Sequence, residues 1–312
     1  MIEPARNALD NRAALTAFGE SLAARGSPQT QARYLRACES LIAVAGDVAL
    51  AQLKRHDLQR ALAKLHARGL SPRTLAVTLS AWRAWFRYLS KTDPTISITV
   101  FTGIKAPKSA KRLPNALSED EAVRLVSPPT QPAATRSTWA EARDQAMFEV
   151  LYGCGIRVGE LIGVDLADVD LANREMRVFG KGRKERVVPL GGPALTAMQS
   201  WIAQRAAGVA ATAINAVFLG ARGERISAPV VRKALKARAL LTGITSHVYP
   251  HRLRHSFASH LLQASGDLRA VQELMGHASI ASTQVYTHLD FQHLAKVYDQ
   301  AHPRARARVA KK

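Results

Sequence analysis

The chain has 312 residues, which is enough for about two domains of ordinary size, each with its own core. Lys and Arg total 44 against 24 for Asp and Glu, so the formal charge is +20, far more than solubility requires. This balance indicates a polyanionic partner, although a basic surface that only meets solvent would have the same composition. Nucleic acid is favoured over membrane because no basic helix with a strong apolar face is evident.

Cysteine content and apolar runs exclude several other classes of protein. Only Cys38 and Cys154 occur, far apart and outside any C-x-x-C motif, so neither a disulfide scaffold nor a cysteine-based zinc site is indicated. No apolar run reaches the roughly 18 residues that span a bilayer, and the first residues do not begin a signal peptide. We therefore expect a cytoplasmic protein without membrane contact.

Three helices are predicted in the first hundred residues. Two of them open with Ser-Pro, at Ser27-Pro28 and Ser71-Pro72, which pairs an N-cap residue with proline at the first helical position. After Ser71, apolar residues recur every three or four positions and form one stripe that we expect to face a core: Leu75, Leu79, Trp82, Phe86 and Leu89. Residues 1–102 are therefore predicted to form a helical domain.

A change of composition marks a predicted domain boundary. Residues 103–116 contain two prolines, four cations and no apolar periodicity, so we expect a linker there. Ser118 and Glu121 are spaced as a capping box, which indicates that a helix and a second domain begin close by. The second domain is predicted over residues 117–299, followed by a basic tail over 300–312.

The second domain is predicted to be α+β with little β structure. Residues 176–179 and 186–189 are expected to pair as a hairpin around Gly180-Lys181-Gly182-Arg183. Helices precede this hairpin, and four more are predicted to follow it, starting near Ser227, Pro250, Asp267 and Ser279, the last ending near Tyr286. The whole chain is thus predicted to be mainly α with a small β-sheet.

Arg157 is the first candidate for chemistry. It lies in Gly153-Cys154-Gly155-Ile156-Arg157-Val158-Gly159-Glu160-Leu161, where a Gly-x-Gly break separates two helical stretches. The break can hold the arginine at a helix start, which suits an anion. The segment alone equally allows a surface arginine paired with Glu160 one turn along.

His251 and Arg254 are the next candidates. They are three apart in a helix that opens at Pro250, which places them on one face near the positive end of the helix dipole, where they can hold a phosphate. His251 and His255 are four apart, as in a zinc motif, but Arg252 replaces the usual glutamate and the neighbouring cations oppose a dication. A zinc site is therefore not expected.

His277 and Tyr286 complete an ordered set, although each alone is typical of ordinary packing or surface exposure. The set resembles the signature of the tyrosine recombinase (phage-integrase-type) family, with these members: Arg157 in G-x-G-x-R-x-x-E-L, Lys181 in the hairpin, His251 and Arg254 in H-x-x-R, His277 after glycine, and Tyr286. The resemblance covers essentially the whole chain, because the first domain resembles that family's SAM-like core-binding domain. Residues 288–305 resemble the branch that resolves bacterial chromosome dimers.

The resemblance implies a reaction without metal, ATP or other cofactor. Tyr286 would attack a scissile phosphate and form a 3′-phosphotyrosyl bond. His251 would accept the phenol proton, because a phenol with a pKa of about 10 is protonated at neutral pH. Arg157 and Arg254 would hold the non-bridging oxygens with forked hydrogen bonds. His277 would add a donor to the same oxygens.

The hairpin would carry the remaining catalytic group. Lys181 would protonate the leaving 5′-oxygen as general acid. Its neighbours Arg183, Lys184 and Arg186 are expected to contact phosphates nonspecifically. Glu160 is expected either to support the site or to meet solvent.

The implied partner is a duplex DNA recombination site held between two basic domains. The resemblance also implies a tetramer with two subunits of a paralogous recombinase, in which the segment after Tyr286 docks on a neighbour, and a septal DNA translocase as regulator. The alternatives are a phage or transposon integrase or a type IB topoisomerase with the same chemistry, a noncatalytic basic DNA-binding protein, and a metal-dependent hydrolase that uses His251 and His255.

Overall fold

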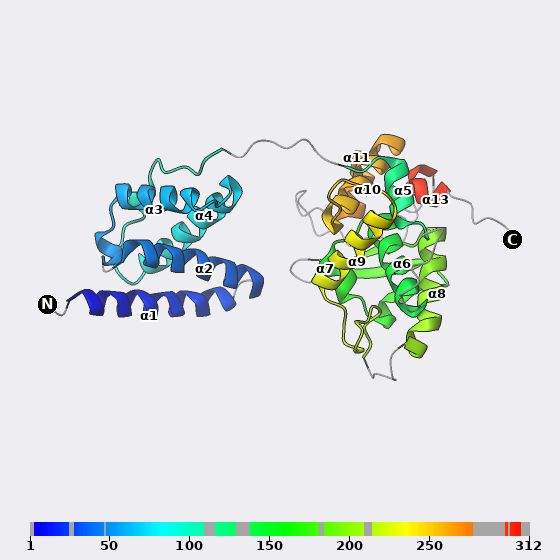
Figure 1. The fold of residues 1–312 in the computed structure, drawn as a ribbon, viewed down its shortest axis with the longest axis horizontal. Helices are drawn as coiled ribbons and strands as arrows, with labels where there is room; N and C mark the ends of the chain where they lie inside the picture. Colours follow the sequence, from blue (N-terminus) through cyan, green and yellow to red (C-terminus); the bar gives the residue numbers. More distant parts are fainter. Residues whose placement is uncertain are drawn as a thin grey trace. The chain divides into compact units, whose positions relative to one another are not determined.

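The structure is a computed structural model that describes residues 3–24, 28–46, 48–108, 116–128, 138–180, 184–208, 214–276, 297–298 and 300–306. The chain divides into an N-terminal unit, residues 1–113, and a C-terminal unit, residues 114–312, each with its own hydrophobic core (Figure 1). Within the described ranges, no helix has both the length and the apolar character of a membrane span.

The N-terminal unit is helical. Its elements are α1 (Glu3–Ala23), α2 (Pro28–Ala45), α3 (Arg55–Ala67) and α4 (Pro72–Leu89), with 3₁₀ turns at Leu50–Gln52 and Ile98–Phe101. Helix α2 packs against α1, α3 and α4. The sequence predicted three helices here and the structure has four, because α1 and α3 begin without the Ser-Pro signal that marks α2 and α4.

Helix α4 supplies much of this unit's core. Its N-cap is Ser71, whose Oγ accepts a hydrogen bond from the backbone N–H of Thr74 at 3.2 Å. The predicted apolar stripe is confirmed, because all five of its residues are buried. Trp82 also donates from Nε1 to the carbonyl oxygen of Ala37 on α2 at 2.6 Å, which fixes the two helices against each other.

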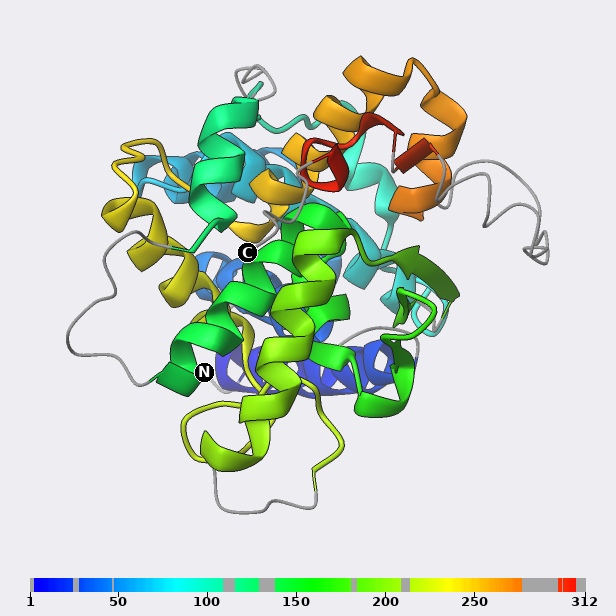
Figure 2. The ribbon, with the colours of Figure 1, turned by 90° about the vertical axis from the view of Figure 1, so that its right-hand side faces the viewer.

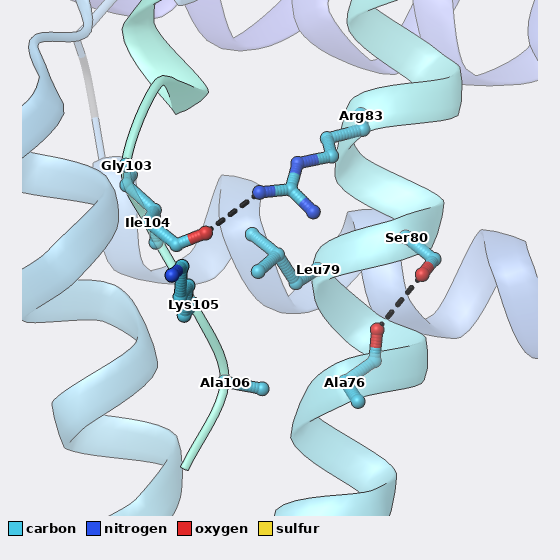
Figure 3. Close-up of a pocket in the computed structure, with 8 residues that line it drawn as sticks. All are labelled: Ala76, Leu79, Ser80, Arg83, Gly103, Ile104, Lys105 and Ala106. Atoms are coloured by element: carbon cyan, nitrogen blue, oxygen red, sulfur yellow. Dashed lines mark hydrogen bonds between the residues drawn. The ribbon is translucent and has the colours of Figure 1, made fainter. Parts of the chain in front are cut away.

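An open pocket of about 460 Å³ lies between α4 and residues 103–106 (Figure 3). Arg83 points into it from α4 and donates from Nη2 to the carbonyl oxygen of Ile104 at 2.7 Å. The Ile104 side chain is buried in the N-terminal core. The first residues of the predicted linker 103–116 therefore pack on the N-terminal unit, and the bounds of the linker stay a prediction.

The C-terminal unit is built around α6. Its helices are α5 (Glu119–Val126), α6 (Thr138–Gly153), α7 (Val158–Gly163), α8 (Gly192–Gly208), α9 (Ala228–Leu241), α10 (Pro250–Ser265), α11 (Leu268–Met275) and α13 (Pro303–Arg306), with a 3₁₀ turn at Leu166–Asp168. Helix α6 contacts α5, α8, α9 and α10, and it lies beside α8 in both views (Figures 1 and 2). The helix predicted between Ser279 and Tyr286 lies outside the described residues.

A small antiparallel sheet flanks these helices. Its strands are β1 (Val169–Asp170), β2 (Glu175–Phe179) and β3 (Glu185–Pro189), in the order β1-β2-β3. The predicted hairpin is confirmed as β2 and β3, with Val178 opposite Arg186. Gly180 N–H donates to the carbonyl oxygen of Lys184 at 2.8 Å at the base of the turn. Strand β1 was not predicted, because two residues carry no alternation pattern.

The chain near its C-terminus packs into the core of its own unit. Tyr298 and His302 are buried and stack on each other, with ring centroids 5.0 Å apart. Arg304 donates to Glu149 on α6 through Nε at 3.0 Å and also through Nη2. Ala301, His302 and Arg304 are therefore buried in this unit, although they lie in the segment 300–312 that we expected to form a basic tail. The bounds of that tail stay a prediction.

Candidate active site

Arg157 follows a backbone turn that glycine makes possible. Gly155 adopts φ +60°, and the ring of Phe257 leaves no room for a side chain there. The chain then enters α7 with Arg157 as N-cap. The Arg157 backbone N–H donates to Glu160 Oε2 and its Nη1 donates to Oε1, each at 2.7 Å. With 36% of its side chain exposed, Arg157 keeps part of its guanidinium open to solvent.

Glu160 is a buried carboxylate surrounded by three guanidinium groups. Arg186 donates to both of its oxygens at 2.8 Å, and Arg254 Nη1 lies 3.9 Å from Oε2, in addition to the contact from Arg157. Burial alone would raise the pKa of Glu160, but the hydrogen bonds and charge of Arg186, followed by those of Arg157, lower it to about 2. One carboxylate therefore faces three cations, and the cluster carries a net charge of two positive units.

Arg254 is buried at the start of α10. Its Nη1 donates to the carbonyl oxygen of Gly155 at 2.5 Å, and its Nη2 donates to that of Met275. Burial and the charge of Arg157 lower its pKa to about 10, so the guanidinium is still charged at neutral pH.

His251 lies one turn before Arg254 and is exposed. Partial burial, together with the charges of Arg254, Arg157 and Arg232, lowers the pKa of its imidazole. The neutral form therefore predominates at neutral pH. A neutral imidazole beside fixed cations can accept a proton.

The end of α11 meets all three arginines. Helix C-termini leave their last carbonyl groups without helical partners and carry partial negative charge. Three consecutive carbonyl groups are each taken by a different arginine: Leu274 by Arg186 at 3.1 Å, Met275 by Arg254, and Gly276 by Arg157 at 3.5 Å. Each of these arginines also contacts Glu160. The cluster is thus bonded to α7, β3, α10 and the end of α11.

The structure brings together Arg157, His251 and Arg254, three of the six predicted site residues. The other three, Lys181, His277 and Tyr286, lie outside the described residues. The described chain on either side of the cluster leads to two of them. A side chain built on Gly180 would lie 3.5 Å from Glu160 Oε1, and Gly276, whose carbonyl faces Arg157, directly precedes His277.

Arg186 lies in a different environment from the one predicted. We expected it to contact phosphates nonspecifically, but it is buried and bonded to Glu160 and Leu274. Lys184, of which the same was expected, is exposed, and Arg183 lies outside the described residues. The sequence contained a signal for this burial, because Arg186 and Val188 are two residues apart on β3 and so lie on the same, inward face of the strand.

The charge around His251 also bears on the alternative of a metal-dependent hydrolase that uses His251 and His255. His251 is faced by Arg254, Arg157 and Arg232, and such cations oppose binding of a dication. In the part of the chain that the structure describes, no group of three or more His, Cys, Asp or Glu side chains is placed to hold a metal ion.

Family models match both units. The phage integrase family matches residues 115–293, and the phage integrase N-terminal SAM-like domain matches residues 15–92. The SAM-like match and the helical structure of the N-terminal unit confirm the predicted SAM-like domain. The described helices, with a sheet of only three short strands among the described residues, confirm the predicted mainly α fold.

The chain is also similar to curated and solved recombinases over most of its length. Tyrosine recombinase XerC of Ralstonia pickettii (strain 12J) is 46% identical over 300 residues, which cover 90% of each chain. Tyrosine recombinase XerC of Chromobacterium violaceum is 46% identical over 296 residues, covering 95% of this chain and 96% of the relative. A crystal structure of the XerH site-specific recombinase bound to a palindromic difH substrate shares the fold, with a TM-score of 0.69, 22% identity, and coverage of 86% of this chain and 79% of that one. With its two family domains and relatives of this similarity, the chain belongs to the phage integrase family of tyrosine recombinases.

Proposed function

We propose that this chain is a site-specific DNA recombinase that cuts and rejoins DNA strands through a 3′-phosphotyrosyl bond to Tyr286. The observation that carries the proposal is the cluster of Arg157, Arg186 and Arg254 around Glu160, next to His251. A fixed cluster with excess positive charge suits the phosphorane-like transition state of phosphoryl transfer, in which negative charge gathers on the non-bridging oxygens.

In the proposed cleavage step, Tyr286 Oη forms a bond to the scissile phosphorus and the bond from phosphorus to the 5′-oxygen breaks. The phenol proton passes to neutral His251, and Lys181 donates a proton to the leaving 5′-oxygen. Arg157 and Arg254 hold the non-bridging oxygens, with His277 as a further donor. The phosphotyrosyl ester retains the bond energy, so a 5′-hydroxyl can reverse the step on another strand without ATP.

The cellular role is proposed from the relatives. Curated relatives at 43 to 47% identity carry the name Tyrosine recombinase XerC, and residues 288–305 resemble the same branch. We propose that the chain acts in the cytoplasm on duplex recombination sites, in a heterotetramer with a XerD-like recombinase. The assembly would resolve chromosome dimers at cell division, with a septal DNA translocase as regulator.

The test is formation of a covalent protein–DNA adduct. The protein is incubated with nicked duplexes that carry the host's terminus-region recombination site, with and without EDTA and with and without a XerD-like partner. Denaturing gels report slow-migrating adducts. We expect an adduct with the wild type and none with Tyr286→Phe, which has no nucleophile but keeps its ring.

Three results would overturn the proposal, or the part of it that concerns the partner, in different ways. DNA binding without any adduct, even with the partner, would favour a noncatalytic DNA-binding protein. Cleavage that EDTA abolishes, or that survives Tyr286→Phe, would favour a hydrolase. Adducts that form on the site without need of a XerD-like partner, with complete recombination by this chain alone, would replace the heterotetramer by an integrase-type reaction.

A further inference from the structure

Arg186 occupies a position where a strand normally places an apolar side chain. On β3, Arg186 and Val188 face inward and Glu185 faces solvent, and the residue opposite Arg186 is the buried Val178. Only 8% of Arg186 is exposed. A buried cation is costly unless it is paired and hydrogen-bonded, so its retention needs a specific partner.

The partners of Arg186 fix its guanidinium in one orientation. Nη1 and Nη2 each donate to one oxygen of Glu160 at 2.8 Å, and Nε donates to the carbonyl oxygen of Leu274 at 3.1 Å. Parallel bonds from a guanidinium to a carboxylate determine the plane of both groups. Arg186 thereby joins β3 to α7 and to the last turn of α11.

This arrangement determines how Glu160 meets the other two arginines. Because Arg186 takes both carboxylate oxygens, Arg157 reaches only Oε1 through its side chain, and Arg254 stays 3.9 Å from Oε2. Arg157 and Arg254 therefore keep donors that are not committed to Glu160. Without Arg186, the carboxylate would be able to bind either of them in a forked pair and would cancel its charge.

Arg186 also contacts the turn that leads to His277. Gly276 has φ +60°, and a side chain built there would lie 3.1 Å from Arg186 Cδ and 3.2 Å from Nη1. The Arg186 side chain thus packs against the turn at Gly276, while its Nε donates to the carbonyl oxygen of Leu274 two residues earlier. The carbonyl groups that Arg157 and Arg254 use belong to the same turn.

We propose that Arg186 is a positioning residue for strand cleavage, which fixes Glu160 and the end of α11 and so keeps Arg157 and Arg254 available to the scissile phosphate. Arg186 itself does not touch the DNA. The inference rests on the proposed recombinase function, because it concerns the orientation of groups that act on the phosphate.

The experiment compares Arg186→Gln and Arg186→Lys with wild type in full-length protein. Single-turnover adduct formation on nicked duplex at saturating DNA gives the cleavage rate, and titration gives the Kd for the same DNA. We expect Arg186→Gln to cleave about a hundredfold more slowly, as misplaced catalytic groups do, with the Kd unchanged. Arg186→Lys should recover little, because an ammonium group cannot form the forked pair.

A second substrate separates positioning from loss of fold. A methylphosphonate at the scissile position lacks one non-bridging oxygen and its charge, so its cleavage depends less on the arginines. If Arg186 acts through them, the ratio of wild-type to variant rates will be several-fold smaller on this substrate. A merely structural defect would slow both substrates by the same ratio. All rates are measured well below the melting temperature of each variant, and Arg186→Lys carries the comparison if Arg186→Gln does not fold.

Arg177→Gln is the matched control, because Arg177 lies on the neighbouring strand β2 with 43% of its side chain exposed and pairs with Asp168 outside the cluster. It should cleave like the wild type. Wild-type cleavage by both Arg186 variants, or equal rate ratios on the two substrates, would overturn the role of Arg186. Absence of any wild-type adduct would instead refute the proposed function, so the two failures are distinct.

Discussion

Arg157 is the most open of the three arginines around Glu160, and its own contacts determine what a substitution does. One terminal nitrogen is held by Glu160, and among the described residues the other makes only the long contact of 3.5 Å to the carbonyl oxygen of Gly276. The second nitrogen can therefore turn to a phosphate oxygen while the first keeps the group in place. Lysine has a single terminal nitrogen and cannot do both.

We predict that Arg157→Lys lowers the single-turnover cleavage rate about a hundredfold, which corresponds to about 3 kcal/mol of transition-state stabilisation. The Kd for duplex DNA should stay close to that of the wild type, because many other cations contribute to binding. Rates come from adduct formation on nicked duplex, and Arg177→Lys serves as control. A variant as fast as wild type would show that a forked contact is not needed at this position.

Glu160 gives the fold a dependence on acid pH. Burial opposes its ionisation, but Arg186 and Arg157 lower its pKa from 4.5 to about 2. Because the folded pKa lies below the unfolded value, the carboxylate stabilises the fold fully above a pH near 4.5, and this contribution is lost as the pH falls towards 2. The contribution at neutral pH is about 3 kcal/mol.

We predict that Glu160→Gln is less stable at neutral pH and loses less stability than wild type between pH 4.5 and 2. Urea denaturation at a series of pH values measures the free energy of unfolding. Glu185→Gln is the control, because Glu185 is exposed on the neighbouring surface of β3. Parallel pH profiles for wild type and Glu160→Gln would contradict the low pKa.

At the scale of elements, Tyr298, His302 and Arg304 near the C-terminus are buried in the C-terminal unit. Their contacts to α6 are both aromatic and ionic: the His302 ring packs against that of Tyr152 with centroids 4.9 Å apart, and Arg304 forms a forked pair with Glu149. Burial keeps the pKa of Glu149 above its usual value, although Arg304 and Gln145 act in the opposite direction. The carboxylate thus depends on Arg304 to remain ionised inside the core.

We predict that Arg304→Met destabilises the C-terminal unit by about 3 to 5 kcal/mol, the usual cost of leaving one partner of a buried ion pair alone. Thermal and urea denaturation measure the loss. The double variant Arg304→Met/Glu149→Gln should recover part of it, because no buried charge is then left unpaired. Arg222→Met, on the exposed turn before α9, is the control. An effect no larger than that of Arg222→Met would mean that the segment is not held by this pair.

Elements with local signals could be predicted, and contacts between distant residues could not. Ser71 and Ser118 mark their helices because a hydroxyl next to the first turn satisfies free backbone N–H groups. By contrast, Arg186 and Glu160 are 26 residues apart, and nothing in either local pattern pairs them. The ordered motifs predicted Arg157, His251 and Arg254, which the structure brings together. The catalytic roles of these three residues stay predictions, as do the places and roles of Lys181, His277 and Tyr286.

At the scale of the whole molecule, positive charge is shared by both units. Residues 1–113 contain 18 Lys and Arg against 7 Asp and Glu, and residues 114–312 contain 26 against 17. The two units therefore carry +11 and +9. Each unit by itself has the charge expected of a protein surface that neutralises DNA phosphates.

We predict that log Kd for duplex DNA rises linearly with the logarithm of the salt concentration. The affinity should fall by about three to five orders of magnitude between about 50 and 200 mM salt if roughly 6 to 10 phosphates are contacted. Fluorescence anisotropy with a labelled duplex measures the slope. A single charge-removing variant in either unit, such as Arg177→Gln, should change that slope by no more than about one unit. A nearly flat salt dependence would mean that the net charge does not act in binding.

The two cysteines fall one to each unit, and both are fully enclosed. Burial raises the pKa of Cys38 and of Cys154 to about 12, so neither forms the thiolate that reacts with disulfide reagents while its unit is closed. The native chain should therefore resist such reagents, and each thiol should react only when the unit around it opens. Mass spectrometry of peptides labelled at rising urea concentration would then measure the unfolding of each unit separately, with Cys38 reporting on the N-terminal unit and Cys154 on the C-terminal unit.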